Sequence, residues 1–183
     1  MEAYIALLRG INVSGQKQIR MSDLKELFAA LGAEAVSTYI QSGNVVFRHR
    51  TSSIPELIRQ IEEKIAEKYG FEVSVLIRTA TEIKNILEHN PFAGETGLEP
   101  NQPYVTILSG KPIADNIQTI DPILYEPDRF VIREKEIYQC FPNGYGQTKL
   151  TNALFEKKLK VTATTRNWKT IQALVTMAEL ISG

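Results

Sequence analysis

The segment from residue 144 to residue 169 is unusually basic, and it predicts a site for an anion. It holds six Lys or Arg residues and one acid, in a chain whose 21 basic and 21 acidic residues balance. Lys149 and Arg166 fall where two helices are expected to begin. A cation at a helix N-terminus opposes the helix dipole and costs about 0.3–1 kcal/mol, so we expect a bound anion to offset this cost.

The loop before the first of these helices carries groups that suit phosphate. Thr148 and Lys149 follow Gly144 and Gly146, and backbone N–H groups at a helix start can cradle a phosphate together with a lysine. The spacing is not that of a Walker A loop, because the threonine precedes the lysine. An alternative is a glycine-rich connection in which Thr148 or Thr151 only caps the helix.

The second helix start is predicted within residues 164–168. Thr164 or Thr165 is a suitable N-cap, which leaves Arg166 in the first turn with Asn167 beside it. The guanidinium fork suits bidentate binding of a phosphate or carboxylate. The alternative for Arg166 is an ion pair with an acidic side chain of the surface.

A second group of candidate residues lies in the loop 9–20. This loop carries three cations and no acid, and Asn12 adds a side chain able to bond backbone or ligand. It is expected to follow the first strand, which is a frequent place for ligands. The alternative is a solvated loop in which Asn12 fixes a turn. The three cations are Arg9, Lys17 and Arg20.

The remaining polar residues indicate structure more than chemistry. Gln41 and Asn44 lie at the tip of a predicted hairpin, where they are candidate ligand contacts, although turn chemistry also explains them. His49 and His89 have no Cys or carboxylate at a spacing typical of a metal site. Cys140 is expected to be a small buried side chain. We therefore expect no metal and no cofactor.

The composition is that of an ordinary soluble globular protein. The chain has 183 residues, of which 43% are hydrophobic and 23% charged, and its net charge is zero. General electrostatic attraction to nucleic acid or membranes is therefore not expected, and any basic surface must be local. The single cysteine fits a reducing cytosol, and no apolar run is long enough for a signal peptide or a membrane span. We expect a cytoplasmic protein; the oligomeric state is left open.

Hydrophobic periodicity predicts the order β-α-β-β-α-β for residues 1–78. Capping boxes at Ser53–Glu56 and Thr79–Glu82 mark two helix starts, and Ser22 is the predicted cap of the first helix. This order is the split βαβ pattern of ferredoxin-like folds. The predicted elements are strands at 3–8, 36–40, 45–47 and 73–77, and helices ending at Gly32 and Gly70.

The rest of the chain predicts an approximate echo of the first part. A helix and a linker rich in Gly and Pro occupy residues 79–103, and residues 104–183 form a second α+β subdomain with the order β-α-β-β-α-α. A hairpin is expected at Glu134–Lys135, and the last two helices from about Leu150 and near Arg166. The residues show no convincing repeat; only the order of elements is similar.

Four segments in order resemble a widespread bacterial family of proteins of unknown function, number 1697. They are RGINVSG (residues 9–15), TYIQSGNVVF (38–47), TKLTNALFEKKL (148–159) and ATTRNW (163–168). The resemblance implies an α+β fold of two ferredoxin-like βαββαβ subdomains with antiparallel sheets and C-terminal helices, and it implies no activity. The family usually has Gly-Gly where this chain has Ser14-Gly15.

Two functions from different classes agree with these residues. The first is binding of a phosphorylated or otherwise anionic ligand, either a small molecule such as a nucleotide or a nucleic acid, at a site that joins loop 9–20 to the two basic helix starts. The second is an enzyme acting on a small phosphorylated or anionic metabolite, with Lys149 and Arg166 stabilising negative charge. The candidate ligand-binding residues are Arg9, Asn12, Lys17, Gln41, Asn44, Thr148, Lys149, Arg166 and Asn167.

Overall fold

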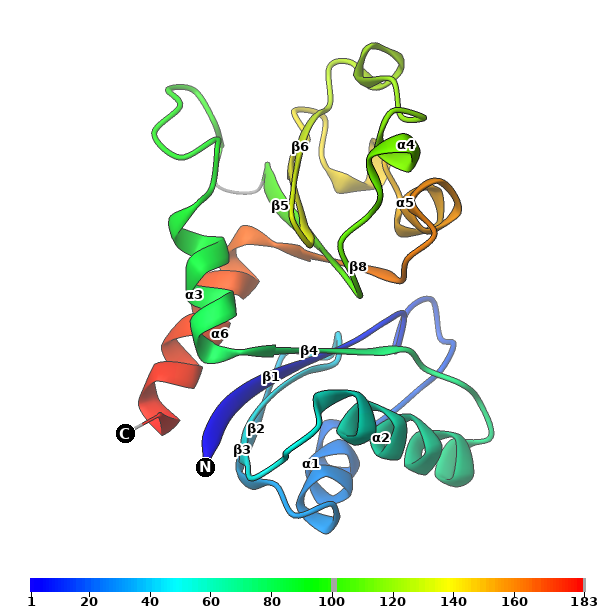
Figure 1. The fold of residues 1–183 in the computed structure, drawn as a ribbon, viewed down its shortest axis with the longest axis vertical. Helices are drawn as coiled ribbons and strands as arrows, with labels where there is room; N and C mark the ends of the chain where they lie inside the picture. Colours follow the sequence, from blue (N-terminus) through cyan, green and yellow to red (C-terminus); the bar gives the residue numbers. More distant parts are fainter. Residues whose placement is uncertain (100–101, 183) are drawn as a thin grey trace. The chain divides into compact units, whose positions relative to one another are not determined.

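A computed structural model describes residues 1–99 and 102–182 of the chain, and Figure 1 shows its fold. Part of the predicted linker 92–103, namely Pro100 and Asn101, lies outside the described residues. No helix of the described residues is both long and apolar enough to cross a membrane.

The chain divides into two compact units, and each contains a four-stranded antiparallel sheet. The first unit is formed by Met1–Asn85 with Gln172–Gly183, and the second by Ile86–Ile171. The sheet orders are β2-β3-β1-β4 and β6-β7-β5-β8. The α+β class and the two ferredoxin-like subdomains expected from the sequence are thereby confirmed.

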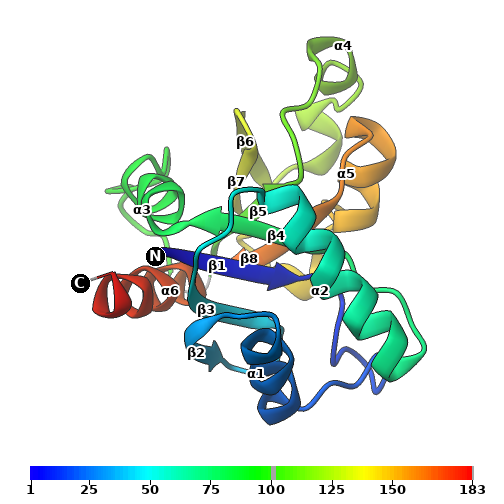
Figure 2. The same ribbon diagram turned by 60° about the horizontal axis from the view of Figure 1, so that its bottom comes forward.

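In the first unit, α1 and α2 cover one face of the sheet (Figures 1 and 2). Alternate residues of β1, such as Tyr4, Ala6 and Leu8, point into the core beneath these helices. The helices contribute apolar side chains at helical spacing, among them Phe28 and Ile61. The elements are β1 (Glu2–Leu8), α1 (Met21–Ala30), β2 (Glu34–Tyr39), β3 (Asn44–His49), α2 (Ile54–Tyr69), β4 (Val75–Thr79) and the start of α3 (Ala80–Glu88).

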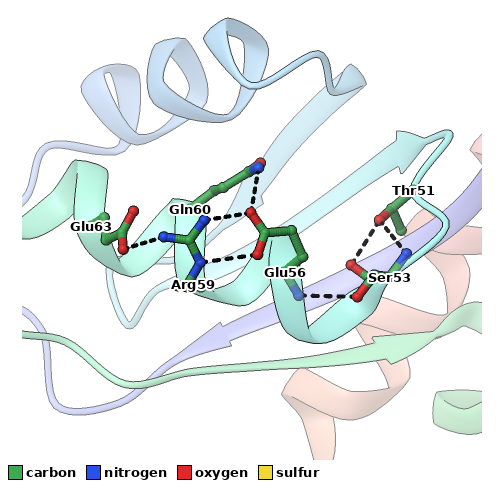
Figure 3. Close-up of polar contacts among 6 residues, drawn as sticks. All are labelled: Thr51, Ser53, Glu56, Arg59, Gln60 and Glu63. Carbon is green, nitrogen blue, oxygen red and sulfur yellow. Dashed lines mark hydrogen bonds and ion pairs between the residues drawn. The ribbon is translucent and has the colours of Figure 1, made fainter.

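Figure 3 shows the first turns of α2, where the predicted cap is confirmed. The Oγ of Ser53 accepts a hydrogen bond from the Glu56 backbone N–H at 3.3 Å. The Glu56 carboxylate does not complete the reciprocal bond of a capping box and instead accepts from Arg59, which holds the pKa of Glu56 below its usual value. Because these side chains are exposed, they form a solvated charged surface of the helix.

Two other predicted helix starts have different outcomes. The capping box of α3 is complete, since the Thr79 backbone N–H donates to the Glu82 carboxylate at 2.9 Å and the Glu82 N–H donates to Thr79 Oγ1 at 3.1 Å. The predicted cap Ser22 is wrong. The N-cap of α1 is Arg20, which has no side-chain capping bond, and Ser22 lies inside the first turn.

The second unit repeats the β-α-β-β-α-β order of the first. Its core lies between the sheet and α5, around Phe141, Phe155 and Leu159. The predicted hairpin at Glu134–Lys135 is confirmed, with Glu134 in a left-handed conformation at φ 48°. The elements are β5 (Pro103–Leu108), α4 (Ala114–Ile117), the 3-10 helix η1 (Pro122–Tyr125), β6 (Arg129–Arg133), β7 (Glu136–Cys140), the 3-10 helix η2 (Tyr145–Gln147), α5 (Asn152–Leu159), β8 (Ala163–Asn167) and the start of α6 (Trp168–Ile181).

The β8 strand corrects the sequence prediction for residues 163–167. This segment was expected to start the last helix, but it pairs with β5 and completes the sheet. Its consecutive threonines suit a pleated strand better than a helix, because β-branched side chains lose rotamer freedom in a helical turn. The last helix therefore begins at Trp168. In the second unit β8 pairs with β5, as β4 pairs with β1 in the first unit.

The two sheets match residue by residue at their last strands. Tyr4 lies opposite Thr79 in the first sheet, and Tyr104 lies opposite Asn167 in the second. One residue further along, Arg78 and Arg166 also occupy equivalent positions, opposite Ile5 and Val105. The units are thus structural repeats.

Candidate functional site

The predicted site residues fall into two groups that belong to different units. Arg9, Asn12, Lys17, Gln41 and Asn44 lie in the first unit. The other predicted residues, Thr148, Lys149, Arg166 and Asn167, lie in the second unit. The combination of these groups into one site stays a prediction.

Asn12 organises loop 9–20. Its side-chain amide donates to the carbonyl oxygens of Ile19 at 3.0 Å and Gln41 at 2.7 Å, while its Oδ1 accepts from the Ile19 N–H at 2.9 Å. The backbone is left-handed at φ 54°, a conformation that Asn adopts more readily than most residues. The alternative in which Asn12 fixes a turn is therefore confirmed, and its amide is engaged with the protein.

The turn between β2 and β3 packs directly against the start of this loop. The Leu8 N–H donates to the Gly43 carbonyl at 2.8 Å. A Cβ atom at Gly43 would lie 2.8 Å from atoms of both Leu8 and Ile11, so no larger residue fits there without a shift. Asn44 is fully buried and donates to the Tyr39 carbonyl, which makes it a support of the turn.

Lys17 connects the loop to the segment after α2. Its Nζ donates to the Glu72 carbonyl at 2.6 Å, and its backbone is left-handed at φ 46°. A lysine has three N–H donors, so this bond leaves capacity for a further acceptor. Arg9 is half-buried, and its backbone N–H donates to the Ser74 carbonyl at 2.9 Å.

A depression of about 530 Å³ lies between this loop, the β2–β3 turn, the start of α1 and the end of α2. Arg20 is exposed at its edge, and Asp23 lies half-buried in the first turn of α1. The Tyr69 hydroxyl lies 3.4 Å from Asp23 Oδ2, and burial is the main cause that raises the pKa of Tyr69. The lining residues are Asn12, Gln18, Ile19, Arg20, Asp23, Gln41 and Tyr69.

This depression brings together two of the predicted residues, Asn12 and Gln41, with residues that the sequence did not single out as ligand contacts. Arg20 was visible as a loop cation. Asp23 and Tyr69 meet only through packing of α1 against α2, so no local spacing in the sequence relates them.

Lys149 lies in a smaller depression of the second unit, about 110 Å³ in volume. Glu126 and Asp128 line the same depression, so its charge is mixed. The helix α5 begins at Asn152, and its N-cap is Thr151, whose Oγ1 accepts from the Leu154 N–H at 3.2 Å. Lys149 therefore lies just before the helix, as the sequence predicts, and Thr151 is the cap. Thr148 Oγ1 accepts from the Leu150 N–H at 3.0 Å and shapes the approach to the helix.

The predicted position of Arg166 in a helical turn is wrong, because it lies in β8 with only 8% of its surface exposed. Its guanidinium donates to Thr164 Oγ1 at 2.8 Å and to the Thr165 carbonyl at 2.9 Å. Burial lowers the pKa of Arg166 to about 10. The cap of α6 is Asn167, whose Oδ1 accepts from the Thr170 N–H at 2.8 Å. The helix-dipole argument for a ligand at Arg166 therefore fails.

The first 138 residues match a known family model, described as a protein of unknown function (DUF1697). The chain belongs to this family. The matched residues include loop 9–20, the β2–β3 turn and every lining residue of the larger depression. The segments 148–159 and 163–168, which also carried the resemblance, lie beyond the match.

The chain is also similar to a solved structure, that of the conserved bacterial protein SP0830 from Streptococcus pneumoniae. The two share 23% sequence identity over 97% of this chain and 98% of the other, with a TM-score of 0.75. At this identity the likeness shows the fold. A comparison with curated proteins gives no match. Within residues 1–99 and 102–182, no group of three or more His, Cys, Asp or Glu side chains is arranged to hold a metal ion.

Proposed function

We propose that the depression beside loop 9–20 binds a small phosphorylated or otherwise anionic ligand, such as a nucleotide. One observation carries this proposal: Arg20 stands at the start of α1 on the edge of a depression of about 530 Å³ that is lined mainly by polar side chains. Pockets that bind small molecules commonly have volumes of about 300–1,000 Å³.

The electrostatics of the α1 start support an anion. Arg20 is the N-cap and makes no side-chain capping bond, so the first backbone N–H groups of the helix need other partners. The carboxylate of Asp23 in the first turn interacts favourably with the positive end of the helix dipole. The cation of Arg20 interacts unfavourably with it. A phosphate beside Arg20 would accept from its guanidinium and from the exposed helix start.

A comparison of the two structural repeats supports the first unit as the place of function. Residues 9–20 connect the first strand to the first helix there, whereas residues 109–113 make the same connection in the second unit. The longer loop holds three non-glycine residues with positive φ, at Asn12, Ser14 and Lys17. Such conformations cost about 1–3 kcal/mol for most residues and less for Asn, and they gather at functional sites. Since the fold forms with a short connection, the long loop serves another purpose.

The lining residues favour binding over acid–base chemistry. Burial raises the pKa of Tyr69 further above neutral pH, so its phenol is protonated there. Among the lining residues that the structure describes, Asp23 carries the one carboxylate, with no second acid or histidine beside it.

Calorimetric titration with adenosine monophosphate tests the proposal. We expect binding by the wild type and an affinity lower by about tenfold or more in Arg20→Ala, because a hydrogen bond to a charged group contributes about 1.5–3 kcal/mol. Arg50→Ala removes an exposed cation elsewhere in the same unit and is the matched control. Equal affinity in the wild type and Arg20→Ala, or no binding by either, would refute the proposal.

The salt dependence of binding separates a small ligand from nucleic acid. A mononucleotide held by one or two cations should show a shallow slope of log K against log salt. For a single strand bound through several phosphates, the slope should be steeper by about 0.7 for each phosphate contact. We expect tighter binding of the mononucleotide than of a (dT)10 oligonucleotide at equal concentration of phosphate groups.

A further inference from the structure

We infer that the ligand of this depression carries a sugar next to its phosphate, and that Asp23 and Tyr69 bind the sugar hydroxyls. The inference rests on the proposed function and adds the chemistry of the uncharged part of the ligand. The shared unit is a pentose 5-phosphate, either free or as part of a 5′-nucleotide.

Asp23 has acceptor capacity that the protein does not use. Its Oδ1 accepts from Ser22 Oγ at 3.3 Å and its Oδ2 from the Tyr69 hydroxyl at 3.4 Å. Hydrogen bonds between hydroxyls and carboxylates have optimal lengths of about 2.5–2.8 Å, and a carboxylate has about four acceptor positions. No cation of the described residues forms an ion pair with Asp23. The carboxylate is therefore available to donors in the depression.

Tyr69 is held so that its hydroxyl stays at this carboxylate. It is the last residue of α2, and its ring stacks on Phe71 with 5.8 Å between centroids and an interplanar angle of 26°. The Lys68 ammonium lies 5.5 Å from the centroid of the same ring. Burial raises the pKa of Tyr69, so the phenol remains a hydrogen-bond donor as well as an acceptor.

The charges and donors of the depression match a hydroxylated phosphate ester. Arg20 offers a cation for the phosphate, whereas Asp23 offers an acceptor for neighbouring O–H groups. A vicinal diol presents two such donors to one carboxylate. Gln18 and Gln41 line the same depression and can both donate to and accept from further hydroxyls. Inorganic phosphate alone would leave the Asp23 carboxylate without a new partner.

Calorimetric titrations of the full chain with inorganic phosphate, ribose 5-phosphate, 2-deoxyribose 5-phosphate and adenosine monophosphate test this inference. We expect ribose 5-phosphate to bind about tenfold more tightly than inorganic phosphate or the deoxy sugar, because only it offers the 2,3-diol to Asp23. Adenosine monophosphate distinguishes the two sources: tighter binding than ribose 5-phosphate indicates a nucleotide, and equal binding indicates a free sugar phosphate. Both results support the sugar-binding role of Asp23.

The variants Asp23→Asn and Tyr69→Phe make the test specific. Asp23→Asn removes a negative charge, so it should bind inorganic phosphate as tightly as the wild type or more tightly, yet bind ribose 5-phosphate about tenfold more weakly. Tyr69→Phe should also weaken the sugar selectively. Glu26→Gln, on an exposed position of the same helix, should change neither affinity.

Two results would overturn the inference, and they differ in what they say about the proposed function. Equal affinity of the wild type for inorganic phosphate and ribose 5-phosphate, with Asp23→Asn affecting both alike, would refute the role in sugar binding and leave anion binding intact. Binding of none of the four probes would refute the anion site itself.

Discussion

The side-chain amide of Asn12 lies 2.7 Å from the backbone carbonyl of Gln41 and joins loop 9–20 to the turn between β2 and β3. The same side chain bonds the N–H and the carbonyl of Ile19, so it also closes the loop on itself. Asn12 thus fixes the backbone of Ile19 and Gln41, which line the depression, and it would affect a ligand through their positions.

Replacement of Asn12 by Ala should destabilise the protein by about 1–3 kcal/mol, because it leaves backbone groups of Ile19 and Gln41 without their partner. It should also weaken binding of adenosine monophosphate. Asn12→Asp retains the acceptor for the Ile19 N–H, but its second carboxylate oxygen would face the carbonyl oxygens of Ile19 and Gln41, so it should destabilise the protein at least as much as Ala. Urea denaturation measures the stability. An Asn12→Ala protein as stable as the wild type would contradict this role.

The close approach at Gly43 predicts a large effect of a single methyl group. Gly43→Ala places its Cβ 2.8 Å from Leu8 and Ile11 and adopts φ 77°. Gly70→Ala is the matched control, since Gly70 has φ 74° and no atom within 4 Å of its added Cβ. We expect a loss of about 1–2 kcal/mol for Gly70→Ala from the left-handed backbone, and of about twice that for Gly43→Ala. Similar losses of unfolding free energy for the two variants in denaturant would contradict this prediction, because they would mean that the contact with Leu8 and Ile11 relaxes without cost.

The capping box at α3 predicts opposite effects for two threonines. Thr79→Ala removes the acceptor of the Glu82 N–H and should lower the free energy of unfolding by about 1 kcal/mol. Thr81→Ala lies at an exposed position inside the helix, where Ala has the higher helix propensity, so it should be neutral or slightly stabilising. The midpoints of urea unfolding check both. A loss in Thr81→Ala equal to that in Thr79→Ala would argue against the cap.

Tyr138 predicts a loss of stability in alkali. Burial is the main cause that raises its pKa to about 12, and its hydroxyl donates to the Ile86 carbonyl at 3.2 Å. In the unfolded chain the phenol loses its proton near pH 10. Its contribution is therefore fully present below pH 10 and is lost as the pH rises from 10 to about 12.

Urea unfolding between pH 9 and pH 12 measures this contribution as the difference between the wild type and Tyr138→Phe. The wild type should lose more stability over the interval, with an extra slope of at most about 1.4 kcal/mol per pH unit. The difference isolates Tyr138 from Arg166, whose lowered pKa acts in the opposite direction. Parallel dependence of stability on pH for the wild type and Tyr138→Phe would contradict the raised pKa of Tyr138.

Local signals in the sequence predicted most of the fold. The short apolar run of β1, the stripe of α2 and the Thr79–Glu82 box need only neighbouring residues, and they were read correctly. The β8 strand was not. A threonine before an apolar helical pattern looks the same whether it caps the helix or belongs to a strand that leads into it. Only pairing with β5 decides between the two.

The candidate site shows the same division between local and distant information. The loop cations and Asn12 were visible because they lie together in the chain. The contact of Asp23 with Tyr69 depends on α1 packing against α2, and the strand position of Arg166 depends on the sheet that buries it. Residue types alone therefore identified the first loop as a candidate but not the side chains that complete its depression.

Chemical-shift mapping of the backbone amides during titration with ribose 5-phosphate locates the ligand without a mutation. We expect saturable shifts concentrated in residues 12–23, at Gln41 and at Tyr69, which surround the depression. Shifts concentrated around residues 143–149, or no saturable shifts at all, would contradict the proposed site.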